Sequence, residues 1–138
     1  MKSARRALPA LAIALVLAIS LFGCRSGDIT VTEEDAGTIQ AAHVGDRVTV
    51  RLDGNPSTGF NWTRTEPANA ELAGPALRPI EEGTWEFPMN EQVPGMSGMC
   101  LFRYVANEPG TVTLSFAYGR SWESEPVDTF SVVIWVRE

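Results

Sequence analysis

The chain has 138 residues, and its 17 acidic and 11 basic side chains give a formal charge of -6. This length leaves room for one domain and not for a multidomain enzyme. The charge argues against a nucleic-acid partner, because neutralising phosphates requires a basic face. The single histidine leaves few metal-binding or acid–base schemes open, so we expect no metal and no cofactor. Hydrophobic residues make up 44% of the chain beside 12 glycines and 9 prolines, which favours a turn-rich, all-β domain over a disordered chain.

The first 23 residues have the pattern of an export signal. Basic residues precede the apolar run 7–22, which is short for a membrane-spanning helix and ends at Gly23 and Cys24. This ending resembles a bacterial lipobox, in which the cysteine is acylated and becomes the new N-terminus. We therefore expect a lipid anchor at Cys24 that attaches the protein to a membrane of the bacterial cell envelope. Ordinary secretion with cleavage near Gly23, giving a soluble protein, is the alternative.

These features divide the chain into three parts: a signal peptide with lipobox at 1–23, a lipidated N-terminus and tether at 24–34, and the folded domain at 35–138. Export removes three basic residues and no acidic one, so the mature chain is more acidic than the precursor. If Cys24 carries lipid, Cys100 has no partner within the chain, and we expect no disulfide. We also expect a monomer.

Alternating apolar residues predict the strands, because side chains of period two point to one face. Short strands are expected near 29–31, 47–52, 60–63, 77–80, 100–106, 111–118 and 130–136. In the second half of the chain the alternation is clean, whereas 66–98 is rich in proline and glycine and allows only the short strand at 77–80. We see no useful helical periodicity after residue 24. About seven or eight strands separated by turns predict an immunoglobulin-like β-sandwich, with Trp62 as a candidate core tryptophan.

The first loop that packing does not explain is Asn55-Pro56-Ser57-Thr58-Gly59-Phe60. Pro56 fixes one backbone dihedral, Gly59 permits a positive φ, and the polar side chains can bond to nearby backbone groups. Together they predict a stiff protrusion that bears hydroxyl groups. An ordinary tight turn between two strands is the alternative.

Two later loops also carry residues that suggest binding. Gly95-Met96-Ser97-Gly98 precedes a strand, and its glycines would let a partner chain approach the backbone, although a flexible connection is equally consistent. Arg120-Ser121-Trp122-Glu123 lies at the tip of a predicted hairpin. Arginine and tryptophan are enriched at binding hot spots, while the alternative folds Trp122 back over the end of the sandwich.

Taken in this order, the three loops resemble the three loop motifs of the chagasin family, which are inhibitors of papain-like cysteine peptidases. The likeness spans nearly all of the mature domain. Ser57 and Phe60 replace the threonine and tyrosine of the family's first motif. Ser97 stands where the family commonly has glycine, and Ser121 where it commonly has proline.

The resemblance implies that 35–138 is an immunoglobulin-like inhibitor domain that presents three neighbouring loops as a wedge. The loop at 55–60 would enter the peptidase cleft, with Thr58 nearest the catalytic cysteine and histidine. The loop at 95–98 would lie along one side and pair through its backbone. Arg120 and Trp122 would flank the other side. Inhibition would be reversible occlusion without covalent chemistry, so the protein would not be an enzyme.

The sequence gives little support to other functions. A thiol enzyme would need Cys100 and His43 to meet, but the strand pattern around Cys100 predicts a buried thiol, and we expect His43 to be solvated. Acidic pairs such as Glu81-Glu82 predict solvated faces, and the spacing for calcium binding is missing. A non-inhibitory adhesion or interaction module of the cell envelope with the same fold remains the alternative.

Overall fold

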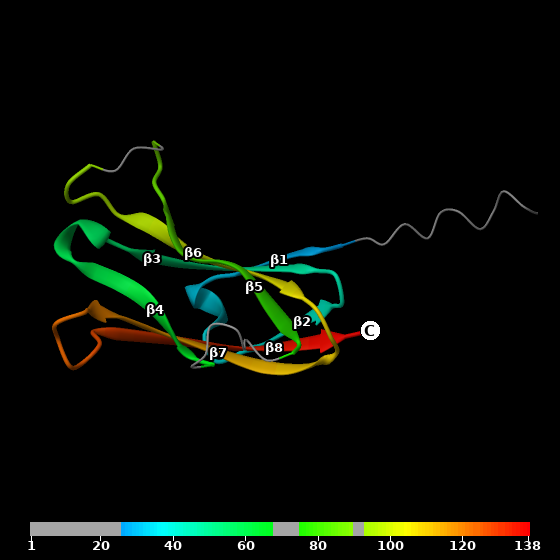
Figure 1. Ribbon diagram of the computed structural model, residues 1–138. Helices are drawn as coiled ribbons and strands as arrows, with labels where there is room; N and C mark the ends of the chain where they lie inside the picture. Colours follow the sequence, from blue (N-terminus) through cyan, green and yellow to red (C-terminus); the bar gives the residue numbers. More distant parts are fainter. Residues whose placement is uncertain (1–25, 68–74, 90–92) are drawn as a thin grey trace, which may run out of the picture.

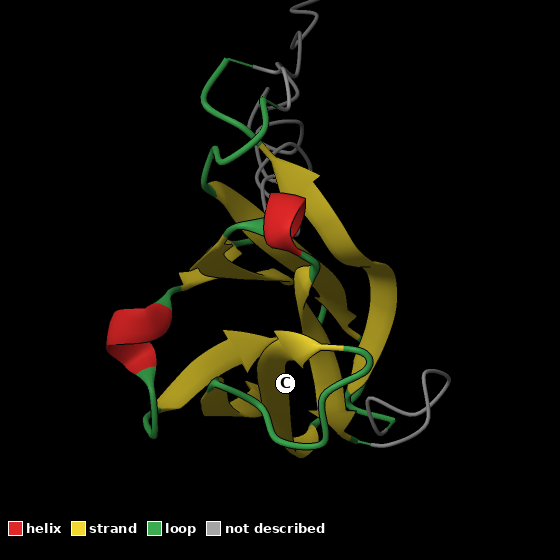
Figure 2. Cartoon of the chain, turned by 90° about the vertical axis from the view of Figure 1, so that its left-hand side faces the viewer, coloured by secondary structure: helices red, strands yellow, loops and turns green. Residues whose placement is uncertain are grey.

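Two four-stranded sheets pack face to face in a computed structural model that describes residues 26–67, 75–89 and 93–138 (Figures 1 and 2). The first sheet has the order β1 (Asp28–Val31), β3 (Arg47–Gly54), β6 (Gly98–Ala106), β5 (Leu77–Glu86). The second has the order β2 (Ile39–His43), β8 (Asp128–Arg137), β7 (Gly110–Arg120), β4 (Phe60–Glu66). Two short 3-10 helices, η1 (Glu33–Asp35) and η2 (Pro56–Thr58), interrupt the connections. The predicted immunoglobulin-like β-sandwich is confirmed.

Side chains from alternate positions of both sheets fill the space between them. Trp62 is 5% exposed and Cys100 is 1% exposed, so both are core residues as predicted. The rings of Phe102 and Phe116 meet across the two sheets with their centroids 4.5 Å apart. Every strand predicted with clean alternation buries its apolar face, represented here by Val48, Val50, Leu52, Tyr104, Ala106, Val112, Leu114, Phe130, Val132, Ile134 and Val136.

Strand β5 is longer than the sequence predicts. The expected strand at 77–80 extends to Glu86, so the prediction was wrong in its length. The pairing register between β5 and β6 shifts twice, between Pro79 and Glu81 and between Glu82 and Thr84. Gly83, at the second shift, has a φ of +74°. Because each bulge moves later side chains to the other face, the strand shows no continuous alternation.

Strand β2 (Ile39–His43) was not predicted at all. It lies at the edge of its sheet, where it pairs in parallel with β8 alone. Only Ala42 among its residues is buried, which leaves too little hydrophobic pattern to identify a strand.

The export signal and Cys24 lie outside the described residues. Lipid attachment and location therefore stay predictions. Within the expected tether at 24–34, residues 28–31 form β1, which pairs in parallel with β3. None of the helices among the described residues has the length and apolar character needed to cross a membrane.

The strand directions give the sandwich two distinct ends (Figure 1). Three connections lie at one end, which we call the loop pole: loop 1 (55–59, between β3 and β4), loop 2 (the described residues 87–89 and 93–97, between β5 and β6) and loop 3 (121–127, between β7 and β8). The start of β1 and the C-terminus lie at the other end, the terminal pole.

Candidate functional site

Strand pairing brings the three loops together at the loop pole. On one side, Gly54 at the end of β3 pairs with Gly98 at the start of β6, so loop 1 leaves its sheet beside loop 2. On the other side, Phe60 at the start of β4 pairs with Arg120 at the end of β7, so loop 1 returns beside loop 3. Loop 1 therefore connects the two sheets and lies between the other two loops.

Loop 1 contains a 3-10 turn that is stabilised by hydrogen bonds within the loop. The side-chain oxygen of Asn55 accepts a hydrogen bond from the backbone N–H of Ser57 at 3.1 Å, which caps the turn. Pro56 occupies the first turn of η2, where its missing N–H costs nothing. Gly59 ends the turn with a φ of +85°, a conformation that favours glycine. The backbone features predicted from Pro56 and Gly59 are present, whereas the function of the loop stays a prediction.

Two hydrogen bonds connect loop 1 to loop 2. The Asn55 amide nitrogen donates to the carbonyl oxygen of Gly95 at 3.1 Å. The backbone N–H of Gly95 donates to the hydroxyl oxygen of Ser57 at 2.9 Å. Both peptide groups of Gly95 are thus bound by side chains of loop 1.

Arg120 connects loop 1 to loop 3. Its Nε donates to the carbonyl oxygen of Thr58 at 3.0 Å, and its guanidinium also pairs with Glu123 at 3.3 Å. The guanidinium carbon lies 4.2 Å from the ring centroid of Phe60 and 5.8 Å from that of Trp122, which permits cation–π attraction to both rings. The charge of Arg120 is therefore satisfied within the loop pole.

Trp122 rests on loop 1 but stays largely in solvent. A Cβ added to Gly59 would lie 2.4 Å from Cη2 of Trp122, so the indole covers the glycine backbone at close range. The side chain is nevertheless 70% exposed. The indole is thus held against its neighbour while its outer face remains open to a partner.

Tyr118 supports loop 1 from below, a role that the sequence analysis missed. Its hydroxyl accepts a hydrogen bond from the backbone N–H of Asn55 at 2.8 Å. Its ring lies 5.3 Å from that of Phe60 and 5.0 Å from that of Trp62. The sequence placed Tyr118 only at the end of the strand expected at 111–118. Its place as the last residue of that expected strand is the signal that could have indicated contact with the loops.

Comparisons with known proteins agree with this architecture. A sequence model described as chagasin family peptidase inhibitor I42 matches residues 41–134. The chain belongs to the chagasin family. Chagasin from Trypanosoma cruzi is 25% identical over 107 residues, which cover 78% of this chain and 94% of chagasin.

Solved structures share the fold. The cysteine protease inhibitor EhICP2 from Entamoeba histolytica superposes with a TM-score of 0.65 at 20% identity, covering 83% of this chain and 100% of EhICP2. The solution structure of amebosin gives a TM-score of 0.60 at 20% identity, covering 81% of this chain and 100% of amebosin. All three loops of this chagasin-family member fall inside the range matched by the family model. The part that each loop residue plays in inhibition stays a prediction.

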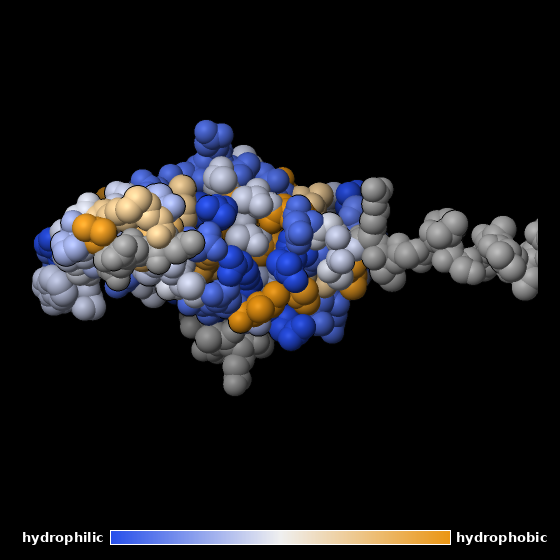
Figure 3. All heavy atoms as spheres, turned by 90° about the horizontal axis from the view of Figure 1, so that it is seen from above, coloured by the Kyte–Doolittle hydropathy of each residue, from blue (hydrophilic) through white to orange (hydrophobic). Residues whose placement is uncertain are grey.

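Apolar side chains outside the predicted motifs add to the surface of the loop pole. Met89 is 68% exposed and Val93 is 41% exposed, and both belong to loop 2. Seen from above, a group of apolar spheres lies at this end, and further apolar spheres lie over the middle of the same face among hydrophilic ones (Figure 3). Large apolar side chains within a proline- and glycine-rich loop were the available sequence signal, because such a loop has no core to bury them.

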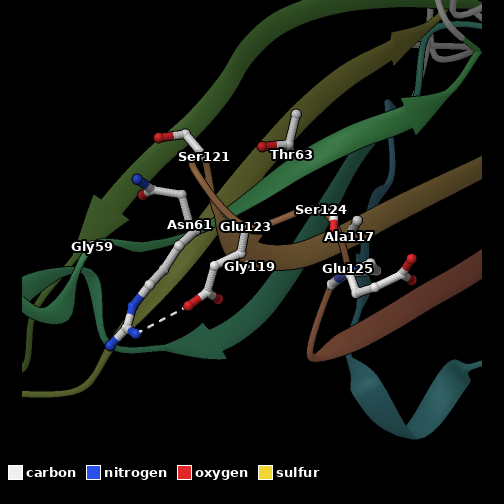
Figure 4. Close-up of a pocket in the computed structure, with 11 residues that line it drawn as sticks. Gly59, Asn61, Thr63, Ala117, Gly119, Ser121, Glu123, Ser124 and Glu125 are labelled. Carbon is white, nitrogen blue, oxygen red and sulfur yellow. Dashed lines mark hydrogen bonds and ion pairs between the residues drawn. The ribbon is translucent and has the colours of Figure 1, made fainter.

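A cavity of about 330 Å³ lies between loop 3 and the outward face of β4 and β7 (Figure 4). Its floor is formed by small residues, including Gly119 and Ala117, and the pair between Arg120 and Glu123 crosses its rim. The remaining lining residues include several polar side chains: Gly59, Asn61, Thr63, Ser121, Ser124, Glu125 and Pro126. The cavity therefore adds hydrogen-bonding groups to the flank of loop 3.

The residues of the alternative thiol enzyme lie apart. Cys100 faces the core from β6, and burial raises the pKa of its thiol to about 12, so it stays protonated and unreactive at neutral pH. His43 lies at the end of β2, at the terminal pole, where its backbone is opposite Arg137 of β8 in the strand register. Its side chain is exposed, as predicted. Among the described residues, no three His, Cys, Asp or Glu side chains are grouped so as to hold a metal ion.

Proposed function

We propose that this chagasin-family protein is a reversible inhibitor of papain-like cysteine peptidases, whose cleft it blocks with loops 1, 2 and 3. Membership of a family of peptidase inhibitors supports inhibition as the activity. The name of its structural neighbour EhICP2, a cysteine protease inhibitor, supports the class of peptidase. The observation that carries the proposal is the convergence of all three motif loops at one pole, with loop 1 in the middle.

Loop 1 is suited to enter a narrow cleft. Ser57 and Thr58 are exposed at its tip, and the turn is fixed by its own cap and by Arg120. A preformed loop loses little conformational entropy on docking, so an ordinary contact area can give tight binding. In this proposal Thr58 lies nearest the catalytic cysteine and histidine, and the peptidase is blocked without forming a covalent bond.

Loop 2 would pair with one wall of the cleft through its backbone. The peptide groups of Gly95 are already bound to loop 1, and Gly98 pairs with Gly54 in the sheet. The backbone N–H and C=O of Ser97 make no hydrogen bond to any part of the chain that the structure describes. We therefore assign the backbone pairing of loop 2 to Ser97. On the opposite wall, the open face of the Trp122 indole would pack on an apolar surface of the peptidase.

Location and attachment form the second part of the proposal. Lipid attachment at Cys24 would anchor the protein in the bacterial cell envelope as a monomer. The position of the first described residues at the terminal pole supports this arrangement, because an anchor there leaves the loop pole uncovered. Metabolic labelling of the expressed precursor with a tagged fatty acid tests it: label in the wild type and none in Cys24→Ala is the expected result.

Titration of papain with the soluble chain lacking residues 1–23 tests the inhibitory function. We expect stoichiometric loss of papain activity and no effect on trypsin. Thr58→Arg should weaken inhibition by about tenfold or more, because a bulky charged side chain at the tip prevents entry into the cleft, while an exposed loop tip contributes little to stability. The matched control is Thr111→Arg, an exposed threonine of β7 near the terminal pole. Unchanged papain turnover at micromolar wild-type protein would instead support the adhesion module.

A further inference from the structure

Ser57 is exposed at the tip of loop 1, yet its hydroxyl already donates one hydrogen bond and accepts another within the protein. The hydroxyl donates its proton to the side-chain oxygen of Asn55 at 2.6 Å and accepts the N–H of Gly95 at 2.9 Å. A serine hydroxyl has a single proton to donate. The Ser57 hydroxyl therefore has no proton left for a hydrogen bond to a peptidase.

Asn55 completes a closed arrangement with Ser57 and Gly95. Its side-chain oxygen accepts from both the N–H and the hydroxyl of Ser57, and its amide nitrogen donates to the carbonyl oxygen of Gly95. Gly95 is held at both of its peptide groups, in a conformation with φ of +83° that favours glycine. We call this set of three residues the clamp.

The clamp begins where the sheet stops holding the two loops together. Pairing between β3 and β6 ends at Gly54 and Gly98, so no ladder hydrogen bond extends beyond these residues. Outside the clamp, no hydrogen bond within the described part of the chain joins loop 1 to residues 93–97. The relative position of the two loops at their tips thus depends on the side chains of Asn55 and Ser57.

We infer that Ser57 is a positioning residue of the inhibitory wedge: its hydroxyl fixes loop 2 against loop 1 before the peptidase arrives. This inference rests on the proposed function. A loop that is ordered in the free protein does not pay that ordering cost on binding, so the clamp contributes to affinity through geometry.

Ser57→Ala and Ser57→Thr separate positioning from direct contact. In the free protein, Ser57→Ala should speed hydrogen exchange of the Gly95 amide about fivefold or more, and it should raise the rate of dissociation from papain about tenfold, as expected for the loss of one net hydrogen bond. Ser57→Thr keeps the hydroxyl and should match the wild type in both measurements. Thr111→Ala removes an exposed hydroxyl from β7 and controls for the loss of any hydroxyl.

Three results would overturn the inference. Unchanged exchange of Gly95 in Ser57→Ala would show that the clamp does not hold in solution. Faster exchange with unchanged dissociation would show that the clamp does not position the inhibitory surface. Loss of both properties in Ser57→Thr would remove the hydroxyl as the cause. If the wild type fails to bind papain, the proposed function fails, and the exchange of Gly95 still decides whether the clamp exists.

Discussion

The two poles of the sandwich are held together by different contacts. At the terminal pole, the carboxylate of Asp46 is buried and accepts hydrogen bonds from the backbone N–H groups of Gly27 at 2.7 Å and His43 at 2.8 Å. At the loop pole, largely exposed groups are joined: the Gly95 N–H to the Ser57 hydroxyl, and the guanidinium of Arg120 to Glu123. Trp122 lies open to solvent. Buried charged hydrogen bonds contribute more to folding than exposed hydrogen bonds and ion pairs. The contacts at the terminal pole therefore contribute mainly to the stability of the fold, whereas the contacts at the loop pole mainly fix the positions of the three loops.

The largest effect is expected at the terminal pole. Asp46→Ala leaves two backbone N–H groups without their charged acceptor and should lower the free energy of unfolding by about 2–3 kcal/mol. Affinity for papain should not change, because the loops lie at the other end. Urea denaturation and papain titration measure the two quantities, with Glu108→Ala, an exposed residue beside the same pole, as the control. Weakened inhibition by the folded variant would contradict the separation of the poles.

At the loop pole, Trp122→Ala should do the reverse. Loss of a central anchor should weaken binding to papain by about 2 kcal/mol or more, while the melting temperature changes little because the side chain is mostly in solvent. Trp135→Ala on β8, which removes another exposed indole, should leave inhibition unchanged. An equal inhibition constant for wild type and Trp122→Ala would place Trp122 outside the binding surface.

Gly59→Ala tests whether the geometry of the loop pole matters as well as its contacts. Its positive φ should cost an alanine about 1–2 kcal/mol of stability. Gly37→Ala is the matched control, because Gly37 also has a positive φ but no atom near the position of a Cβ. Only Gly59→Ala should also weaken inhibition, since its methyl group displaces the Trp122 indole. Equal inhibition by both variants would show that inhibition does not depend on the position of the Trp122 indole.

The smallest expected effect is a change with pH. Burial of Asp46 favours its neutral form, but the N–H groups of His43 and Gly27 and the nearby imidazole outweigh burial and hold its pKa below the usual value. The stabilisation is therefore present above the unfolded-state pKa of about 4 and is lost as the pH falls through the folded-state pKa. The stability difference between wild type and Asp46→Asn should be constant above about pH 5 and shrink below about pH 4. A constant difference down to pH 2 would contradict this assignment.

The fold followed from the sequence wherever strands alternate cleanly. Strands such as Arg47–Gly54 and Gly110–Arg120 bury one face, and their period of two is visible in the residues themselves. The predicted strand at 77–80 was shorter than β5 because the bulges of β5 interrupt that period. Strand β2 was missed in the sequence analysis because this strand buries only Ala42. Local pattern is therefore sufficient for strands with one regular buried face.

The candidate site was predictable as three loops but not as one surface. Ser57 and Gly95 are 38 residues apart in the sequence, and the Tyr118 hydroxyl reaches a backbone group 63 residues away. Such contacts depend on the pairing register of strands on either side, which no local motif specifies. The sequence thus identified the candidate residues, whereas the bonds that hold them in place required the folded chain.

The location of the start of β1 and the C-terminus at the same end has a practical consequence. A carrier protein, fluorophore or solid support joined just ahead of β1 or at the C-terminal end of β8 would leave the wedge facing outward. A copy attached to a surface in this way would meet enzymes that approach from the surrounding solution. The same molecule could thus be displayed, labelled or immobilised without redesign of its recognition surface.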